Sequence, residues 1–271
     1  MMETFGGLAL AGGKRQGTAL ALLALEEKTN QLFLTDLYGK LGSTPSKTSD
    51  QALLHVIQKR GDPPSILGIN VPLALPPCLL CQLPWCPGHE ACEVESVVWM
   101  RKAQVRISKK YKHSKPPLPY IQRPVEVYLR ENISHELDLP GAYSSNVSPL
   151  VARIQYLKRH LSQSIQLIEI LPRLTFYQLA PLFGLDAKLA FTYRGPEKGS
   201  EDRYRFLSRL KEHVPLFIYD RDLELLTLNP PCFDAFLGAY TAFLFKQGLC
   251  ENPPENFPLD EGWVAFPKMS G

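Results

Sequence analysis

The sequence lacks any apolar run that approaches the roughly 20 residues needed to span a bilayer. Its first residues carry no basic region ahead of an apolar stretch, so no targeting leader is expected. It also lacks internal repeats and low-complexity tracts, which argues against fibrous and disordered classes. We therefore expect a soluble, cytoplasmic protein with no membrane contact.

Several catalytic signatures are missing as well. The six histidines form no zinc-protease pair, and no serine elbow is present, so a hydrolase triad is not indicated. A strong overall charge is absent too, because the formal net charge is only +3 over 271 residues. The hydrophobic content of 45% suffices for a sizeable core, and the length fits one decorated domain or two small ones.

What the sequence does contain is a cysteine cluster. Four of the six cysteines share one short stretch, and they are Cys78, Cys81, Cys86 and Cys92. Thiolates are soft ligands, and four of them can surround a tetrahedral ion and replace core that a short loop cannot build. The spacing predicts a structural zinc site, although an iron–sulfur cluster also suits four thiolates and His89 is a fifth donor. Disulfides are a weaker alternative, because Cys232 and Cys250 sit apart and secreted disulfide scaffolds are usually short.

Positive charge concentrates in residues 101–115, which hold seven lysines and arginines and no acid. Such a stripe neutralises phosphates, and the interleaved Tyr111 can stack on a base. A charge run is also commonly just a solvated face. We expect nucleic acid as a partner, and the candidate contacts are Arg106, Lys109, Lys110, Lys112, Arg123 and Arg173.

Hydrophobic patterning predicts an α/β fold. Apolar runs at 8–11, 18–25 and 31–37 indicate three antiparallel strands. A helix capped by Ser49-Asp50 and a buried strand at 66–71 follow. The later expected elements are helices at 150–161, 175–182, 201–213 and 233–247 and strands at 166–170 and 263–266.

Regular alternation is lost between Pro72 and Tyr143, the stretch that holds the cysteine cluster and the basic segment. We interpret residues 74–143 as an insertion with its own metal-stapled core. The insertion would interrupt a single domain that covers residues 1–271.

Three antiparallel strands followed by a helix, a strand, a helix and a strand is the element order of an RNase H-like mixed sheet. Five segments also look like landmarks of one family: 7–14, 68–73, 122–126, 168–173 and 233–239. On these segments the chain resembles the domain of unknown function 429 family, whose members are predicted to be nucleases of RNase H fold.

The resemblance implies carboxylates at strand ends that hold magnesium or manganese and assist phosphodiester hydrolysis. Glu126, Glu169 and Asp234 would be ion ligands, and Asn70 a neutral ligand or orienting group. Ala9 and Asn70 stand where the family pattern has acids, so the site is depleted and its activity impaired.

Each acid also has a structural interpretation. Asp234 can charge the first turn of its helix, and Glu126 can pair with Arg123 or Arg130. Glu169 lies in an apolar strand, where a buried acid needs a partner or a metal.

A glycine loop at residues 11–18 offers a different class of function. Its backbone amides, with Lys14 and Thr18, could cradle a phosphate as in actin-like ATPases, although the loop lacks the Walker spacing and a glycine hairpin between two strands is more commonly only a turn. The sequence thus predicts a metal-dependent nuclease with a depleted site. The alternatives are a non-catalytic nucleic-acid-binding protein of the same fold and an actin-like nucleotide-binding protein.

Overall fold

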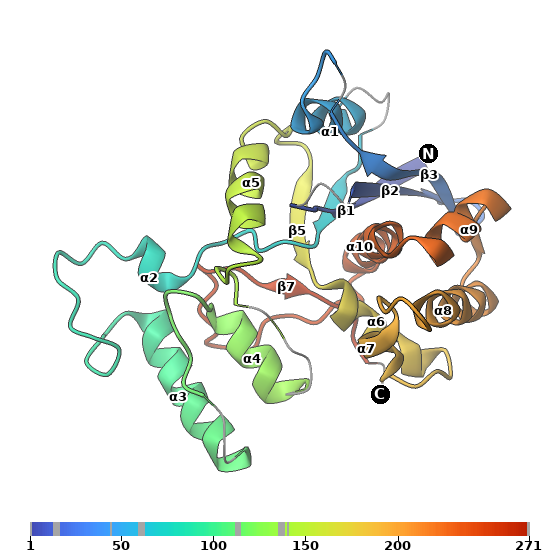
Figure 1. Ribbon diagram of the computed structural model, residues 1–271. Coiled ribbons are helices and arrows are strands. Elements are labelled where there is room, and N and C mark those ends of the chain that lie inside the picture. Colours follow the sequence, from blue (N-terminus) through green and yellow to red (C-terminus); the bar gives the residue numbers. More distant parts are fainter. Residues whose placement is uncertain are drawn as a thin grey trace. The chain divides into compact units, whose positions relative to one another are not determined.

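A computed structural model describes residues 2–12, 17–43, 45–58, 63–111, 115–134, 139 and 141–269 (Figure 1). Its strands are β1 (Met2–Ala9), β2 (Thr18–Glu26), β3 (Gln31–Leu41), β4 (Ile66–Ile69), β5 (Gln166–Ile170), β6 (Leu216–Phe217) and β7 (Val264–Ala265). Its helices are α1 (Ser49–Gln58), α2 (Pro77–Leu80), α3 (Glu95–Lys110), α4 (Pro124–Asn132), α5 (Ser148–Lys158), α6 (Pro172–Leu182), α7 (Leu189–Thr192), α8 (Gly199–His213), α9 (Asp220–Leu228) and α10 (Pro230–Lys246).

Within these ranges, seven strands form one mixed sheet in the order β6-β3-β2-β1-β4-β5-β7. The first three strands form an antiparallel meander, and β4 and β5 extend the sheet in parallel beside β1. The predicted α/β class, with three antiparallel strands ahead of alternating helices and strands, is confirmed.

The first strand begins earlier than its apolar run suggests. We expected residues 8–11, whereas β1 covers Met2–Ala9 and includes Gly6 and Gly7. Glycine is generally disfavoured in strands, but here it allows α10 to approach β1 closely. A Cβ on Gly7 would lie only 1.9 Å from the backbone oxygen of Ala235 in α10.

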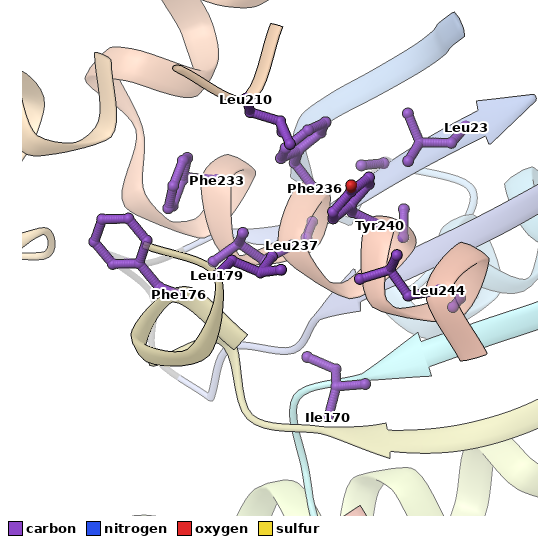
Figure 2. Packing of buried hydrophobic residues seen from close by; sticks show 14 of the residues in the cluster. Leu23, Ile170, Phe176, Leu179, Leu210, Phe233, Phe236, Leu237, Tyr240 and Leu244 are labelled. Atoms are coloured by element: carbon purple, nitrogen blue, oxygen red, sulfur yellow. The ribbon is translucent and has the colours of Figure 1, made fainter. Parts of the chain in front are cut away.

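Helix α10 is the centre of the core. Figure 2 shows Phe236, Tyr240 and Leu244 of this helix beside side chains of the sheet, among them Leu23 and Ile170. Edge-to-face aromatic pairs continue the core, with Phe176 and Phe206 at a centroid distance of 4.4 Å. The predicted amphipathic helix at 233–247 is therefore present, three residues longer at its start, and is mostly buried.

The described residues divide into two compact units. The sheet unit comprises residues 1–71, 155–251 and 265–271, and the cysteine unit comprises residues 72–154 and 252–264. The segment that we interpreted as an insertion, 74–143, falls inside the cysteine unit. Trp99 and Tyr128 pack there with Phe257 and Trp263, at centroid distances of 5.2 Å for Trp99–Phe257 and 5.1 Å for Tyr128–Trp263.

The stretch between Pro72 and Tyr143, for which we predicted no individual helices, contains α2, α3 and α4 in its described part. Helix α3 buries Val97, Met100, Ala103 and Ile107, which recur at helical spacing. This apolar stripe is narrow and is flanked by many charged residues. The helical period is therefore hard to recognise in the sequence of this basic segment.

None of the helices in the described ranges is long and apolar enough to cross a membrane.

Candidate functional site

The strand ends of the sheet unit bring together three of the positions singled out from the sequence. Ala9 ends β1, Asn70 follows β4, and Glu169 pairs with Ile69 near the end of β5. Because β1, β4 and β5 are adjacent and parallel, these positions share one edge of the sheet. The edge carries a methyl group and an amide beside the single carboxylate of Glu169.

Asn70 has a structural role at this edge. Its side-chain oxygen accepts a hydrogen bond of 2.8 Å from the Leu10 backbone N–H, and the backbone N–H of Asn70 donates to the Leu8 backbone carbonyl at 3.1 Å. The side chain thereby fixes the chain that leaves β1 to the end of β4. Its carbonyl oxygen, the atom that could coordinate a cation, is engaged in this bond.

Glu169 projects from the face of the sheet that points away from α10. Side chains alternate along a strand, and directly paired residues share a face. Gly68 faces α10, because a Cβ there would lie 2.5 Å from the Gly238 oxygen. Glu169 pairs with Ile69, the next residue along β4, and therefore projects from the other face. Glu169 is 3% exposed and therefore lies buried on the face away from α10.

Asp234 lies in α10 and is 1% exposed. One of its oxygens accepts a 2.8 Å hydrogen bond from the Tyr193 hydroxyl, and the other forms an ion pair of 3.3 Å with Arg194. Arg203 and Arg173 add positive charge to its surroundings. A guanidinium thus supplies the charge that the family pattern would assign to a metal ion at this carboxylate.

The pKa values of this group follow from burial and charge. Burial raises the pKa of the Asp234 carboxyl, while the Arg194 guanidinium and the Tyr193 hydroxyl oppose that increase. Burial also raises the pKa of Tyr193 well above its ordinary value, and the Asp234 carboxylate adds to the effect. The carboxylate in turn raises the pKa of Arg194. At neutral pH the tyrosine is therefore a hydrogen-bond donor and the arginine a cation.

Glu126 lies in the cysteine unit and pairs with Arg123, as its structural interpretation proposed. The Arg123 guanidinium donates to one Glu126 oxygen from two nitrogens, at 2.6 and 2.9 Å, and the Arg123 backbone N–H donates to the other. Both side chains are buried, at 1% and 6% exposure. One oxygen of Glu126 thus caps the Arg123 backbone N–H at the start of α4, and the other is paired with the guanidinium.

No three His, Cys, Asp or Glu side chains in the described part of the chain are placed to hold a metal ion as they stand. In the sheet unit, Glu169 and the helix that bears Asp234 lie on opposite faces, and Asp234 already has a cationic partner. These two acids of the sheet unit therefore do not share one face of the sheet.

The cysteine cluster has a different geometry. Cys78, Cys81, Cys86 and Cys92 line one cavity of about 170 Å³. All six cysteines fall within the described ranges and all are free thiols, so the structure contains no disulfide among them. Burial raises the pKa of the Cys78 thiol, and the neighbouring thiolates of Cys92, Cys86 and Cys81 raise it further.

The basic segment forms the exposed side of α3. Lys102, Arg106 and Lys109 follow at helical spacing and are exposed, so they share one stripe. Arg106 is held by two hydrogen bonds to Glu131, of 2.5 and 2.9 Å. Lys110 is also exposed and lies over the Tyr111 ring at 5.4 Å.

The remaining residues predicted to contact nucleic acid or phosphate differ in their exposure. Arg123 is buried in its pair with Glu126 and offers no surface contact as it stands. Arg173 is half-buried at the start of α6 and contributes to the charge around Asp234. Lys112 and Lys14 lie outside the described residues. Thr18 is buried and accepts a bond of 3.4 Å from the Ala11 N–H.

Two arginine contacts at these sites were not predicted. Arg194 follows the short helix α7, and nothing local in the sequence links it to Asp234. Arg101 opens the basic segment, but it donates to the backbone oxygens of His89 and Glu90, at 2.5 and 2.6 Å, and so ties α3 to the cysteine loop. Its closeness in sequence to the cysteines was the one available signal.

No protein-family model, curated protein or solved structure matches this chain.

Proposed function

We propose that this chain is a nucleic-acid-binding protein of RNase H-like architecture that binds without hydrolysing, through the exposed basic stripe of α3. The observation that carries the proposal is the stripe itself. Lys102, Arg106 and Lys109 project from one face of a helix whose opposite side is buried.

The sheet supports the architectural part of the proposal. An antiparallel meander of three strands, extended by two parallel strands on the β1 side, is the arrangement that the resemblance implies. This likeness concerns the fold alone, because function resides in the side chains placed on it.

The acids support binding without hydrolysis. Two hard cations need several oxygen ligands with negative charge. Ala9 supplies no ligand atom, and the Asn70 oxygen is bonded to a backbone N–H. Asp234 and Glu126 both have arginine partners. The charges of these two carboxylates are therefore already compensated within the protein.

The stripe has the properties of a phosphate-binding surface. Positions i, i+4 and i+7 of a helix cover about 10 Å along its axis, a length over which a nucleic-acid backbone presents several phosphates. The carboxylate of Glu131 fixes the direction of the Arg106 guanidinium and leaves the two lysines as the mobile point charges.

The test is the salt dependence of binding to fluorescein-labelled single strands and duplexes of DNA and RNA. Each phosphate contact contributes about 0.9 to the logarithmic salt slope on duplex DNA, so Lys102→Gln/Lys109→Gln should reduce the slope by about 2 and weaken binding. Lys188→Gln/Lys211→Gln removes the same charge from exposed positions of the sheet unit and should leave the slope unchanged. Equal effects of the two variants would contradict an α3 site.

A second candidate is metal-dependent phosphodiester hydrolysis. It is favoured by one observation, the placement of Asn70 and Glu169 at neighbouring strand ends. Hydrolysis in magnesium or manganese that is lost in Asp234→Asn would support this candidate against the binding protein.

A further inference from the structure

We infer that the four thiols of the cysteine loop bind one zinc ion as a tetrathiolate site, which stabilises the loop between α2 and α3. This inference is independent of nucleic-acid binding. It rests on the convergence of four soft donors, on the composition of the loop and on its connection to α3.

The geometry brings all four thiols to one place. Cys78 and Cys81 come from α2 and its end, Cys86 from the loop, and Cys92 from the segment that leads into α3, yet all four line the same cavity. Leu83 and Val97 close other parts of its wall. Four thiolates around a shared apolar-walled space are the donor set that zinc takes in structural sites.

Binding would require the thiols to move closer together. Zinc–sulfur bonds are about 2.3 Å long, and the thiols as they stand do not surround one point at that distance. Cys78, Cys81 and Cys86 are exposed, so their side chains are not fixed by packing, whereas the buried Cys92 is the anchored member. Rotation of three exposed side chains toward the anchored thiol would complete the tetrahedron.

The loop has little core of its own. Its large apolar side chains are turned to solvent, with Leu79 45%, Leu83 50% and Trp85 76% exposed. Helix α2 has only four residues and no side-chain cap. Ordering such a segment costs about 1 to 2 kcal/mol of backbone entropy per residue. A metal that binds only the folded loop supplies the missing stabilisation.

Charge near the cavity favours the loaded state. A zinc ion with four thiolates carries a net charge of −2, and Arg101 lies against the loop through the His89 and Glu90 carbonyl oxygens. The ring nitrogen Nε2 of His89 is a buried atom with no hydrogen-bond partner among the described residues. An unsatisfied buried nitrogen in this loop is suited to donate a hydrogen bond to a thiolate. His89 does not line the cavity, so we assign the four ligand positions to the cysteines that do.

The test is metal analysis of the purified full-length chain together with a cobalt titration. We expect about one zinc per chain, and cobalt should produce the thiolate charge-transfer and tetrahedral d–d bands of a four-sulfur site. Cys81→Ser and Cys86→Ser should lower zinc affinity by more than the roughly 10- to 100-fold that loss of a second-shell partner costs. Because a cysteine variant can fail to fold, the titration of the unsubstituted chain decides in that case.

Two controls make the result specific. Cys250→Ser changes a cysteine that bonds to the Thr241 carbonyl elsewhere in the fold and should retain about one zinc. His89→Gln should keep the cobalt spectrum of four thiolates. The inference is overturned by an unsubstituted chain that takes up neither zinc nor cobalt, by iron with visible absorption, or by loss of metal in His89→Gln as large as in Cys81→Ser.

Discussion

The two units use their polar side chains in opposite ways. In the sheet unit, the predicted site residues are bonded or buried: Asn70 bonds to backbone, Glu169 is buried and Asp234 is paired with Arg194. In the cysteine unit, the lysines of α3 and three of the four clustered thiols are exposed. The polar groups named in the sheet unit therefore take part in the packing of the fold, whereas those named in the cysteine unit are open to solvent.

The cysteine unit also contains the buried ion pair of Arg123 and Glu126. Breaking this pair gives the largest predicted effect on stability. Glu126→Gln should destabilise the protein by about 3 kcal/mol, because it breaks a buried ion pair by removing the charge of the carboxylate that accepts two hydrogen bonds from the Arg123 guanidinium. Unfolding in urea, followed by fluorescence, measures this change.

The chain provides a matched control for that substitution. Arg209 and Glu212 form another arginine–glutamate pair at the same i, i+3 spacing, with both side chains about half exposed. Glu212→Gln should change stability by no more than about 1 kcal/mol. Equal effects at the two sites would show that burial does not determine the contribution of the Arg123–Glu126 pair.

The sheet unit depends on close packing between α10 and β1. Gly7→Ala would place a Cβ 1.9 Å from the Ala235 oxygen and should cost about 3 kcal/mol or somewhat less, at the upper end of overpacking effects. Gly42→Ala adds the same methyl group where nothing lies within 4 Å, and should be nearly neutral. Thermal unfolding of both variants checks the comparison, and a Gly7→Ala protein as stable as Gly42→Ala would contradict the packing described for α10.

The substitution Asp234→Asn should have a smaller effect, which appears in the pH dependence of stability. Burial raises its pKa above the ordinary value of 3.8, so the folded chain binds more protons than the unfolded chain above that pH. The stability of the unsubstituted protein relative to Asp234→Asn should therefore fall as the pH rises from 3.8 through the raised pKa. Denaturant unfolding of both proteins across this range measures the difference. A relative stability that increases with pH would show that the arginines outweigh burial.

Much of the sheet could be predicted from the sequence, because its strands alternate with turn residues and α10 has a helical period. The start of β1 could not, since its glycines are explained only by a helix more than 200 residues later in the chain. The same limit applies to the sites. Cysteine spacing predicted which thiols gather around one cavity, because they are close in sequence. The Arg194 partner of Asp234 depends on tertiary contacts, for which no local pattern exists.

Binding without cleavage is the central claim, and one experiment addresses both parts of it. Labelled DNA and RNA strands are incubated with the protein in magnesium or manganese at low salt, and each sample is divided between a native and a denaturing gel. We predict a shifted complex on the native gel and intact strands on the denaturing gel. Absence of the complex, or cleavage that disappears in Asp234→Asn, would contradict the account.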